Sequence, residues 1–199
     1  MRKGDQTRDR IVRETGGLFN RFGYRSTPMS AVMKATGLQK GGLYGHFRSK
    51  KDLAIETFRF NTATLATYLK GATAGAVDPV TELRRFLAAS IGVAEDRALP
   101  GGCPVLNAAV ESDDAFPALR KEVVIGAEGL RRAILRLLTR ALGDGLIRED
   151  VDIQSQSYFF LAAMEGGIML AKLRGGRRPL EAVLAQLNAA IDGFVVEQL

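Results

Sequence analysis

The stretch that decides the fold runs from residue 36 to residue 53 and reads TGLQKGGLYGHFRSKKDL. Gly37 separates two short segments with helical spacing of their apolar residues, and two short helices joined by a glycine-containing turn form a helix-turn-helix. The first segment opens at Thr27-Pro28, which we interpret as the N-cap and first residue of a helix. The motif therefore covers about residues 28–47, and its second helix is the candidate element for the DNA major groove.

Positive charge is concentrated around this motif. Residues 1–51 contain 12 Lys and Arg against 3 Asp and Glu, whereas the remainder contains 16 against 19. The net charge of +6 therefore combines +9 in the first quarter with −3 in the rest. Such an asymmetry is typical of a segment that meets a polyanion, either nucleic acid or an anionic membrane face. A solvated basic arm is the alternative interpretation.

The whole chain has the composition of an ordinary globular protein. Its 199 residues are 46% hydrophobic and 25% charged, with six prolines, which excludes collagenous and disordered classes. Its apolar runs fall short of the roughly 18 residues of a membrane span, and no signal peptide is recognisable, so we expect a cytoplasmic protein without a membrane partner. With one cysteine and one histidine, we expect no internal disulfide, no metal site and no cofactor.

Helical periodicity continues along the chain, and no alternating strand pattern occurs. We therefore expect an all-α fold, with an N-terminal three-helix helix-turn-helix domain at residues 1–50 and a C-terminal helical bundle domain at residues 51–199. The long helices of the second domain are expected at about residues 49–70, 78–97, 114–142 and 152–174 and after Pro179, with a shorter one at about residues 103–111.

The second helix of the motif and the residues at either side of it carry side chains that suit DNA binding. Lys40 and Lys50 supply charge for phosphates, and the amide of Gln39 can read an adenine edge. Tyr44 and His46 can donate hydrogen bonds to phosphate or base. For these two residues the alternatives are structural: Tyr44 at the rim of the small core, and His46 as a cap at the helix end.

Beyond the bare motif, the spacing of individual residues is specific. Phe22-Gly23-Tyr24, Thr27 and residues 36–53 resemble the DNA-binding domain of the tetracycline-repressor (TetR) family, and the resemblance covers about residues 7–58. Members are homodimeric, ligand-responsive repressors, so the resemblance implies a double-stranded operator, a small-molecule effector and a second copy of the chain as partners. The residues that we then expect to contact DNA are Thr27, Ser30, Gln39, Lys40, Gly41, Gly42, Tyr44, His46 and Lys50.

The chain departs from the family pattern at several positions. Gln39 replaces the Ser or Thr that commonly caps the recognition helix, and Gly42 lacks a hydroxyl common at its position. Gly41 and Gly42 together allow close approach of the backbone, but each costs about 1 kcal/mol relative to alanine, so we expect a helix only marginally ordered without DNA. Thr15-Gly16 replaces alanines of the family, which should loosen the packing of the first helix.

The helical body is larger than dimerisation alone requires, which indicates an effector pocket within residues 51–199. Asn107 and Glu111 lie one turn apart and could be its polar anchors, while plain core is the alternative for the apolar candidates. Cys103 precedes Pro104 and would be an N-cap, either as a thiol-reactive sensor or as a small buried filler. The candidate effector-binding residues are Tyr68, Phe86, Ile91, Cys103, Asn107, Glu111, Phe116, Val123 and Tyr158.

The last two helices are the candidate dimer interface, as a four-helix bundle with their symmetry mates. Three other functions stay open: a ligand-independent repressor or activator, a small-molecule-binding or redox-sensing protein without DNA function, and a helical enzyme. We expect no enzyme, because the single histidine lies in the DNA-binding helix and leaves Cys103 without an imidazole partner. The candidate interface residues are Met164, Gly167, Ile168, Leu184, Leu187, Ile191 and Phe194.

Overall fold

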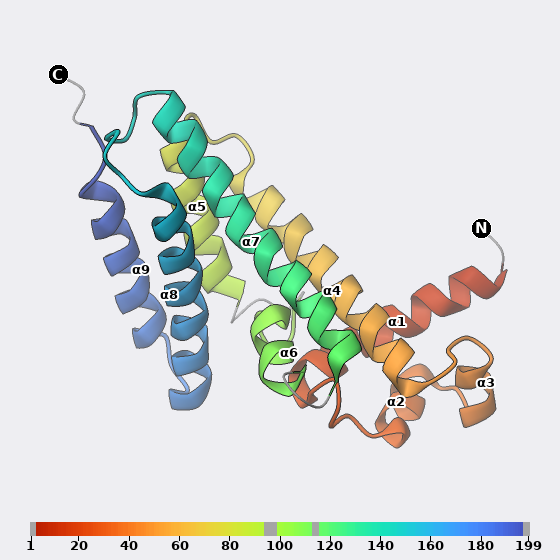
Figure 1. Ribbon diagram of the computed structural model, residues 1–199. Helices are drawn as coiled ribbons and strands as arrows, with labels where there is room; N and C mark the ends of the chain where they lie inside the picture. Colours follow the sequence, from red (N-terminus) through yellow and green to blue (C-terminus); the bar gives the residue numbers. More distant parts are fainter. Residues whose placement is uncertain (1–2, 94–98, 113–115, 197–199) are drawn as a thin grey trace. The chain divides into compact units, whose positions relative to one another are not determined.

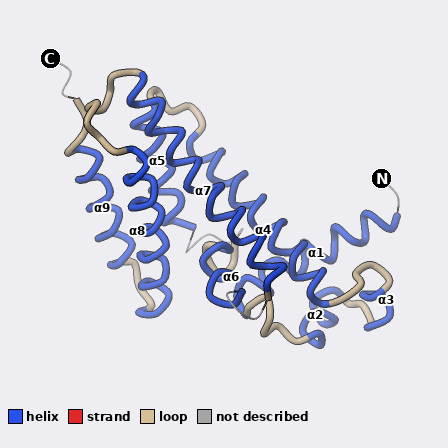
Figure 2. Tube along the Cα trace, in the orientation of Figure 1, coloured by secondary structure: helices blue, strands red, loops and turns tan. Residues whose placement is uncertain are grey.

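The computed structural model describes residues 3–93, 99–112 and 116–196. Within these residues the chain is helical throughout (Figure 1), and the only β-pairing is one antiparallel bridge between Ile147 and Val195. Figure 2 shows the helices separated by short loops, and the predicted all-α fold is confirmed. The helices are α1 (Lys3–Phe22), α2 (Met29–Thr36), α3 (Lys40–Tyr44), α4 (Lys50–Thr73), α5 (Pro79–Gly92), α6 (Pro104–Ser112), α7 (Pro117–Gly143), α8 (Ile153–Arg174) and α9 (Arg178–Asp192).

Most helix ends coincide with local signals in the sequence. Gly23 and Gly37 follow α1 and α2 with φ angles of 97° and 66°, a left-handed conformation that favours glycine. Asp78 and Asp152 cap α5 and α8, each accepting two backbone N–H groups of the first turn. The helix expected over residues 78–97 ends at Gly92 as α5, and residues 94–98 lie outside the described part of the chain.

The chain forms two compact units. Unit 1 consists of Met1–Leu65 and Glu95–Gly126, and unit 2 of Ala66–Ala94 and Ala127–Leu199. Unit 1 thus contains α1, α2, α3 and α6 together with the first parts of α4 and α7. The division at residues 50 and 51 into a DNA-binding and an effector-binding domain stays a prediction, because compactness does not show which part binds an effector.

Unit 1 has a small core of aromatic side chains. Tyr24 stacks on Phe19 at 5.9 Å between ring centroids and meets the edge of Phe58 at 5.6 Å. The Tyr24 hydroxyl accepts a hydrogen bond of 2.8 Å from Asn61 Nδ2, and burial raises the tyrosine pKa. Asn61 also lies where a Cβ at Gly16 would approach its Oδ1 to 2.8 Å. The expectation that Gly16 loosens α1 is therefore wrong, because this glycine admits the side chain of Asn61.

Unit 2 is built around α5, α8 and α9, which pack against one another. Its core is aliphatic and aromatic, with Phe160 and Phe194 6.3 Å apart between ring centroids. Arg84 of α5 ties this core to the end of α9 by pairing with Asp192 at 2.5 Å and donating to Asn188 Oδ1 at 2.9 Å. The three helices therefore pack together within a single copy of the chain.

This packing corrects most of the predicted dimer interface. Met164, Gly167, Ile168, Leu187, Ile191 and Phe194 are all buried inside unit 2 of one protomer, and Leu184 is half-buried. Gly167 serves the same packing, because a Cβ there would lie 3.2 Å from Val183 Cγ2 of α9. The apolar periodicity of these residues therefore reflects the packing of α8 against α9 within one chain and not a contact between two chains.

Candidate nucleic-acid interface

The helix-turn-helix presents one open face at α3. Only Leu43 of this helix is buried, and Tyr44 is 40% exposed. As expected, the side-chain amide of Gln39 makes no capping hydrogen bond at the start of α3. The exposed candidates for DNA contact are Ser30, Gln39, Lys40, Gly41, Gly42 and Tyr44, while His46 and Lys50 are half-buried.

Neither glycine of α3 is required by the packing of the protein. A Cβ at Gly41 would meet nothing within 4 Å, and one at Gly42 would lie 3.7 Å from Leu38 Cδ2, an ordinary contact. Since each glycine costs about 1 kcal/mol relative to alanine in a helix, the fold alone does not explain them. They leave the backbone of α3 bare on a face that a ligand could approach closely.

Thr27 occupies a different place from the one predicted. Its side chain is fully buried, and its hydroxyl donates to the Gly23 carbonyl at 2.7 Å. The N-cap of α2 is Pro28, which makes no side-chain hydrogen bond there, so the predicted capping role of Thr27 is wrong. The Thr27 side chain braces the turn between α1 and α2, and this burial removes it from the surface offered to DNA.

Lys50, at the start of α4, also has a partner within the protein. Its Nζ donates to the Arg25 carbonyl at 2.5 Å. Burial lowers the pKa of the Lys50 ammonium, and the nearby Glu111 carboxylate opposes that change. Lys50 and Arg25 line a cavity of about 260 Å³, together with Tyr24, Lys51 and Phe116. An ammonium has three N–H donors, so the bond to Arg25 leaves two for a phosphate.

The predicted polar anchors of the effector pocket hold the end of α1. Asn107 Nδ2 donates to Asn20 Oδ1 at 3.0 Å and to the Gly101 carbonyl at 2.9 Å. A Glu111 carboxylate oxygen accepts the backbone N–H of Arg25 at 2.8 Å, and a Cβ at Gly23 would overlap the same carboxylate. Asn107 Nδ2 also donates to the backbone carbonyl of Asn20 at 3.1 Å, so both α6 side chains bind backbone at the end of α1 or in the turn that follows it.

The remaining effector candidates are distributed over both units. Phe116 and Val123 are buried in unit 1, whereas Phe86 and Ile91 are buried in unit 2. Two tyrosines of unit 2 are more accessible: Tyr68 is half-buried, and Tyr158 is 61% exposed with the Arg131 guanidinium 4.7 Å from its ring centroid. Their assignment to an effector stays a prediction.

Cys103 precedes α6 directly, as expected of an N-cap, but its side chain is only 2% exposed. Its carbonyl accepts the N–H of Asn107 at 3.2 Å, which starts the helix. Of the two interpretations of this cysteine, the structure favours the buried filler. A thiol-reactive compound would need a local opening to reach the sulfur.

We therefore predict that Cys103 resists alkylation in the folded protein. Iodoacetamide should label the native chain at least about tenfold more slowly than the urea-unfolded chain, because attack requires an exposed thiolate. Mass spectrometry of samples quenched over time measures both rates, with Cys103→Ser as the unlabelled control. Equal rates in the two states would show an accessible thiol and restore the electrophile-sensor interpretation.

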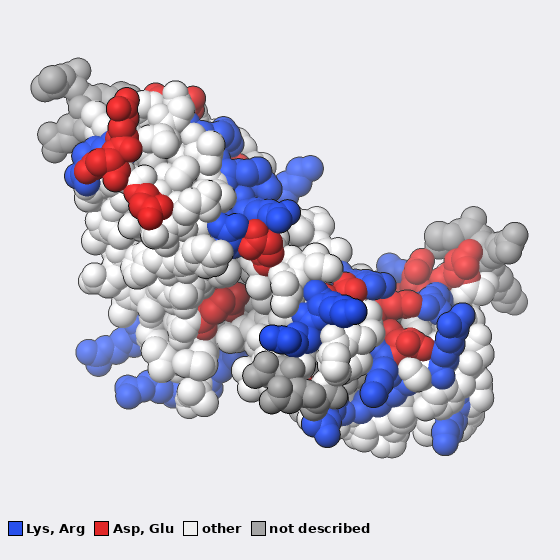
Figure 3. Space-filling view, in the orientation of Figure 1, with Lys and Arg blue, Asp and Glu red and all other residues white. Residues whose placement is uncertain are grey.

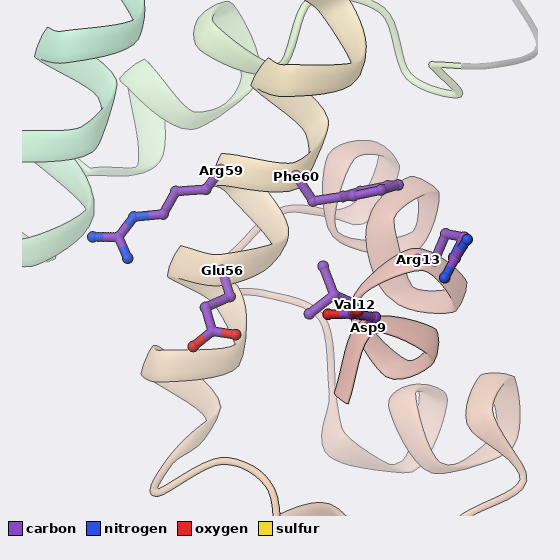
Figure 4. A pocket seen from close by; sticks show the side chains of 6 residues that line it. All are labelled: Asp9, Val12, Arg13, Glu56, Arg59 and Phe60. Carbon is purple, nitrogen blue, oxygen red and sulfur yellow. The ribbon is translucent and has the colours of Figure 1, made fainter. Parts of the chain in front are cut away.

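A second cavity, which no sequence pattern indicated, lies between α1 and α4 within unit 1. Figure 4 shows Asp9, Val12 and Arg13 projecting from α1 and Glu56, Arg59 and Phe60 from α4 around a volume of about 410 Å³. Arg59 points away from α1 and pairs with Glu122 of α7 at 2.6 Å. Acidic, basic and apolar side chains therefore line this cavity together.

On the face drawn in Figure 3, Lys and Arg side chains lie on the surface that carries α1, α2 and α3, and further Lys and Arg side chains lie on unit 2. This agrees with the charge of +9 counted over residues 1–51. Acidic side chains also appear on this face of unit 1. An exposed helix of a helix-turn-helix within a basic segment is typical of a protein that binds the phosphate backbone of DNA.

Comparisons with known proteins agree with this geometry. Residues 11–57 match the family of bacterial regulatory proteins of the tetR type, and residues 79–187 match the tetracyclin repressor-like C-terminal domain. The chain therefore belongs to the TetR family of DNA-binding transcriptional regulators.

Individual relatives match over nearly the whole chain. A TetR transcriptional regulator from Chloroflexus aurantiacus J-10-FL superposes with a TM-score of 0.93 at 37% identity, over 99% of this chain and 100% of that one. The HTH-type transcriptional repressor DhaR of Mycobacterium sp. strain GP1 is 25% identical over 92% of this chain and 91% of its own. A cysteine mutant of the TetR-family regulator CifR, solved with a 26-bp double-strand operator DNA, has a TM-score of 0.80 at 22% identity, over 94% and 95% of the two chains.

Among the described residues, no helix has both the length and the apolar character needed to cross a membrane. No group of three or more His, Cys, Asp or Glu side chains that could hold a metal ion occurs there either.

Proposed function

We propose that this regulator is a homodimeric repressor that binds a palindromic operator through α3 and leaves it when a small-molecule effector binds. The observation that carries the proposal is the open face of α3, whose two glycines serve no packing purpose inside the protein. Membership of the TetR family supports it, as do a relative described as a repressor and a neighbour of the same fold solved with operator DNA.

In the proposed complex α3 lies in the major groove. The bare backbone at Gly41 and Gly42 approaches the base edges, and Gln39 offers an amide that can pair with adenine. Lys40 is exposed beside them and contacts a phosphate. Lys50 contacts another phosphate with the donors that Arg25 leaves unused. Phosphate contacts fix the register, and the base contact selects the sequence.

The effector acts in this proposal through α6. Asn107 and Glu111 hold the backbone at the end of α1 and at Arg25, so a shift of α6 is passed to the helix-turn-helix by hydrogen bonds. A ligand can change DNA affinity only by as much as its affinities for the two arrangements differ. If no compound dissociates the operator complex, the protein is instead a ligand-independent repressor or an activator.

The second copy is proposed to pack on the outer face of α8. Phe159, Leu170 and Leu173 recur on one helical stripe and are 47%, 42% and 75% exposed. Gly166 lies on the same stripe, and a Cβ there would meet nothing within 4 Å. Exposed apolar side chains in such a row mark a contact surface. This stripe replaces the buried residues of the predicted interface.

Lys50→Ala and Gln39→Ala should affect DNA binding in different ways. Lys50→Ala should weaken binding to operator and random duplexes alike and reduce the slope of log K against log salt by about 0.9 per protomer. Gln39→Ala should leave the slope unchanged and alter the preference among bases by about 1–3 kcal/mol per site. Fluorescence anisotropy with labelled duplexes at several salt concentrations measures both, with a duplex selected by the wild-type protein from a random library as operator.

Lys70→Ala is the matched control for charge, because Lys70 is exposed in unit 2. It should reduce the salt slope less than Lys50→Ala does. Equal slopes for Lys50→Ala and the wild type would remove Lys50 from the interface. A wild-type protein that binds no duplex more tightly than random DNA would contradict the proposed function itself.

A further inference from the structure

Arg8 of α1 contacts two other parts of unit 1 through one guanidinium group, namely the turn after α3 and the helix α4. Its Nη1 donates to the backbone carbonyl of His46, the second residue after the recognition helix. Its Nε donates to Glu56 Oε2 of α4 at 3.0 Å, and its Nη2 donates to the other oxygen of that carboxylate. Its Cζ lies 4.4 Å from the ring centroid of Phe47, a cation–π contact. Sequence reasoning did not single out Arg8, because its partners lie 38 to 48 positions away.

The recognition helix needs such external support. α3 has five residues, two of them glycine, and no side-chain hydrogen bond at its N-cap. A helix this short is unstable by itself, because nucleation costs more than so few hydrogen bonds return. Within α3 only Leu43 is buried, and just after it Phe47 is 3% exposed. Two buried side chains alone do not fix the orientation of so short a helix. Its rotation relative to α1 and α4 must be restricted by further contacts.

Arg8 has the geometry to restrict that rotation. The planar guanidinium uses one edge for the Glu56 carboxylate, while Nη1 reaches the carbonyl beyond α3 and one face covers Phe47. The Arg8 and Glu56 side chains are 37% and 29% exposed, so the pair contributes little to global stability. Its directional contacts instead fix where the chain leaves α3 relative to α1 and α4. A lysine could not form the bidentate pair and the carbonyl bond in this geometry.

We propose that Arg8 is a positioning residue for operator recognition, with Glu56 orienting its guanidinium. The inference rests on the proposed function, since it assigns to Arg8 the alignment of α3 in the major groove. Arg8 then acts without touching DNA. It follows that losing Arg8 should reduce specific binding much more than nonspecific binding, because only specific contacts depend on the alignment of base-reading groups. A direct phosphate contact by Arg8 would reduce both equally and lower the salt slope by about 0.9.

The test compares Arg8→Ala, Arg8→Lys and Glu56→Gln with Arg13→Ala. Arg13 is an exposed arginine on the same helix, so its variant removes the same charge without breaking the Arg8 contacts. Anisotropy titrations use the duplex selected by the wild-type protein and a scrambled duplex of equal length. Arg8→Ala should lower the ratio of operator to scrambled affinity about tenfold, the size expected for losing a hydrogen bond to a charged group. Its salt slope should match that of Arg13→Ala, and Arg8→Lys and Glu56→Gln should show smaller losses of the ratio.

Hydrogen exchange of the DNA-free protein provides a readout independent of operator binding. Amides of residues 43–47 should exchange faster in Arg8→Ala and Glu56→Gln than in Arg13→Ala, while those of α8 stay unchanged. If the wild-type protein binds no DNA, the proposed function is refuted. If residues 43–47 nevertheless exchange faster in Arg8→Ala, the role of Arg8 in positioning α3 stands. The positioning role is overturned if Arg8→Ala matches Arg13→Ala in both exchange and affinity ratio, or if only its salt slope falls. Should Arg8→Ala not fold, Glu56→Gln supplies the same comparison.

Discussion

Replacing Leu187 by glutamate should prevent unit 2 from folding. Leu187 is fully buried on α9, and α9 packs against both α5 and α8. The substitution loses the packing of a core leucine, about 2–5 kcal/mol, and places a charge where it has no partner, which costs several kcal/mol more. This sum approaches the whole stability of a typical domain, about 5–15 kcal/mol. We expect insoluble protein, or a soluble chain without a cooperative thermal transition by circular dichroism.

Leu187→Met is the matched control, because a swap that keeps the volume and apolar character usually costs less than about 1.5 kcal/mol. It should melt cooperatively near the wild-type temperature. If Leu187 lay at the dimer interface, as the sequence predicts, Leu187→Glu should yield monomers or insoluble protein. A folded, soluble monomer for that variant would show that Leu187 lies at an interface between copies, against its burial in one protomer.

The parts of the fold that were predictable are those governed by local signals. The turn glycines Gly23 and Gly37 and the cap Asp152 act within a few residues, so their pattern locates helix ends without knowledge of the tertiary structure. Helical periodicity also identified the apolar faces correctly. The exposed character of Gln39 and Lys40 followed from the motif, because a recognition helix must keep one face open.

The parts that were not predictable depend on contacts distant in sequence. Glu111 lies 86 positions from Arg25, and no spacing within α6 could show that its carboxylate binds that backbone N–H. Periodicity likewise shows that Leu187 lies on an apolar face but not whether a neighbouring helix or a second chain covers it. Gly16 shows the same limit for a small residue. Its absent side chain has a purpose only because Asn61 of α4 lies beside it.

The outer face of α8 should control assembly without controlling folding. The double variant Leu170→Glu/Leu173→Glu changes two side chains that are 42% and 75% exposed within one protomer. Since they are accessible in the single chain, charge there should cost the fold little. Two carboxylates facing their symmetry mates across an apolar contact should prevent dimer formation, because like charges would be desolvated together. Light scattering and analytical ultracentrifugation should show a folded monomer at micromolar concentration.

Loss of the dimer should then weaken operator binding by about 100-fold or more, because the second half-site no longer benefits from the effective concentration set by the first. Val77→Glu is the matched control: Val77 is 88% exposed in unit 2, and its substitution also puts a glutamate in place of an exposed apolar side chain. It should stay dimeric and bind the operator as the wild type does. A dimeric double variant would place the interface elsewhere, whereas a monomer with wild-type operator affinity would show that one copy suffices for recognition. The contrast with Leu187→Glu is decisive, because the inner face of the α8–α9 pair should govern folding and the outer face should govern pairing.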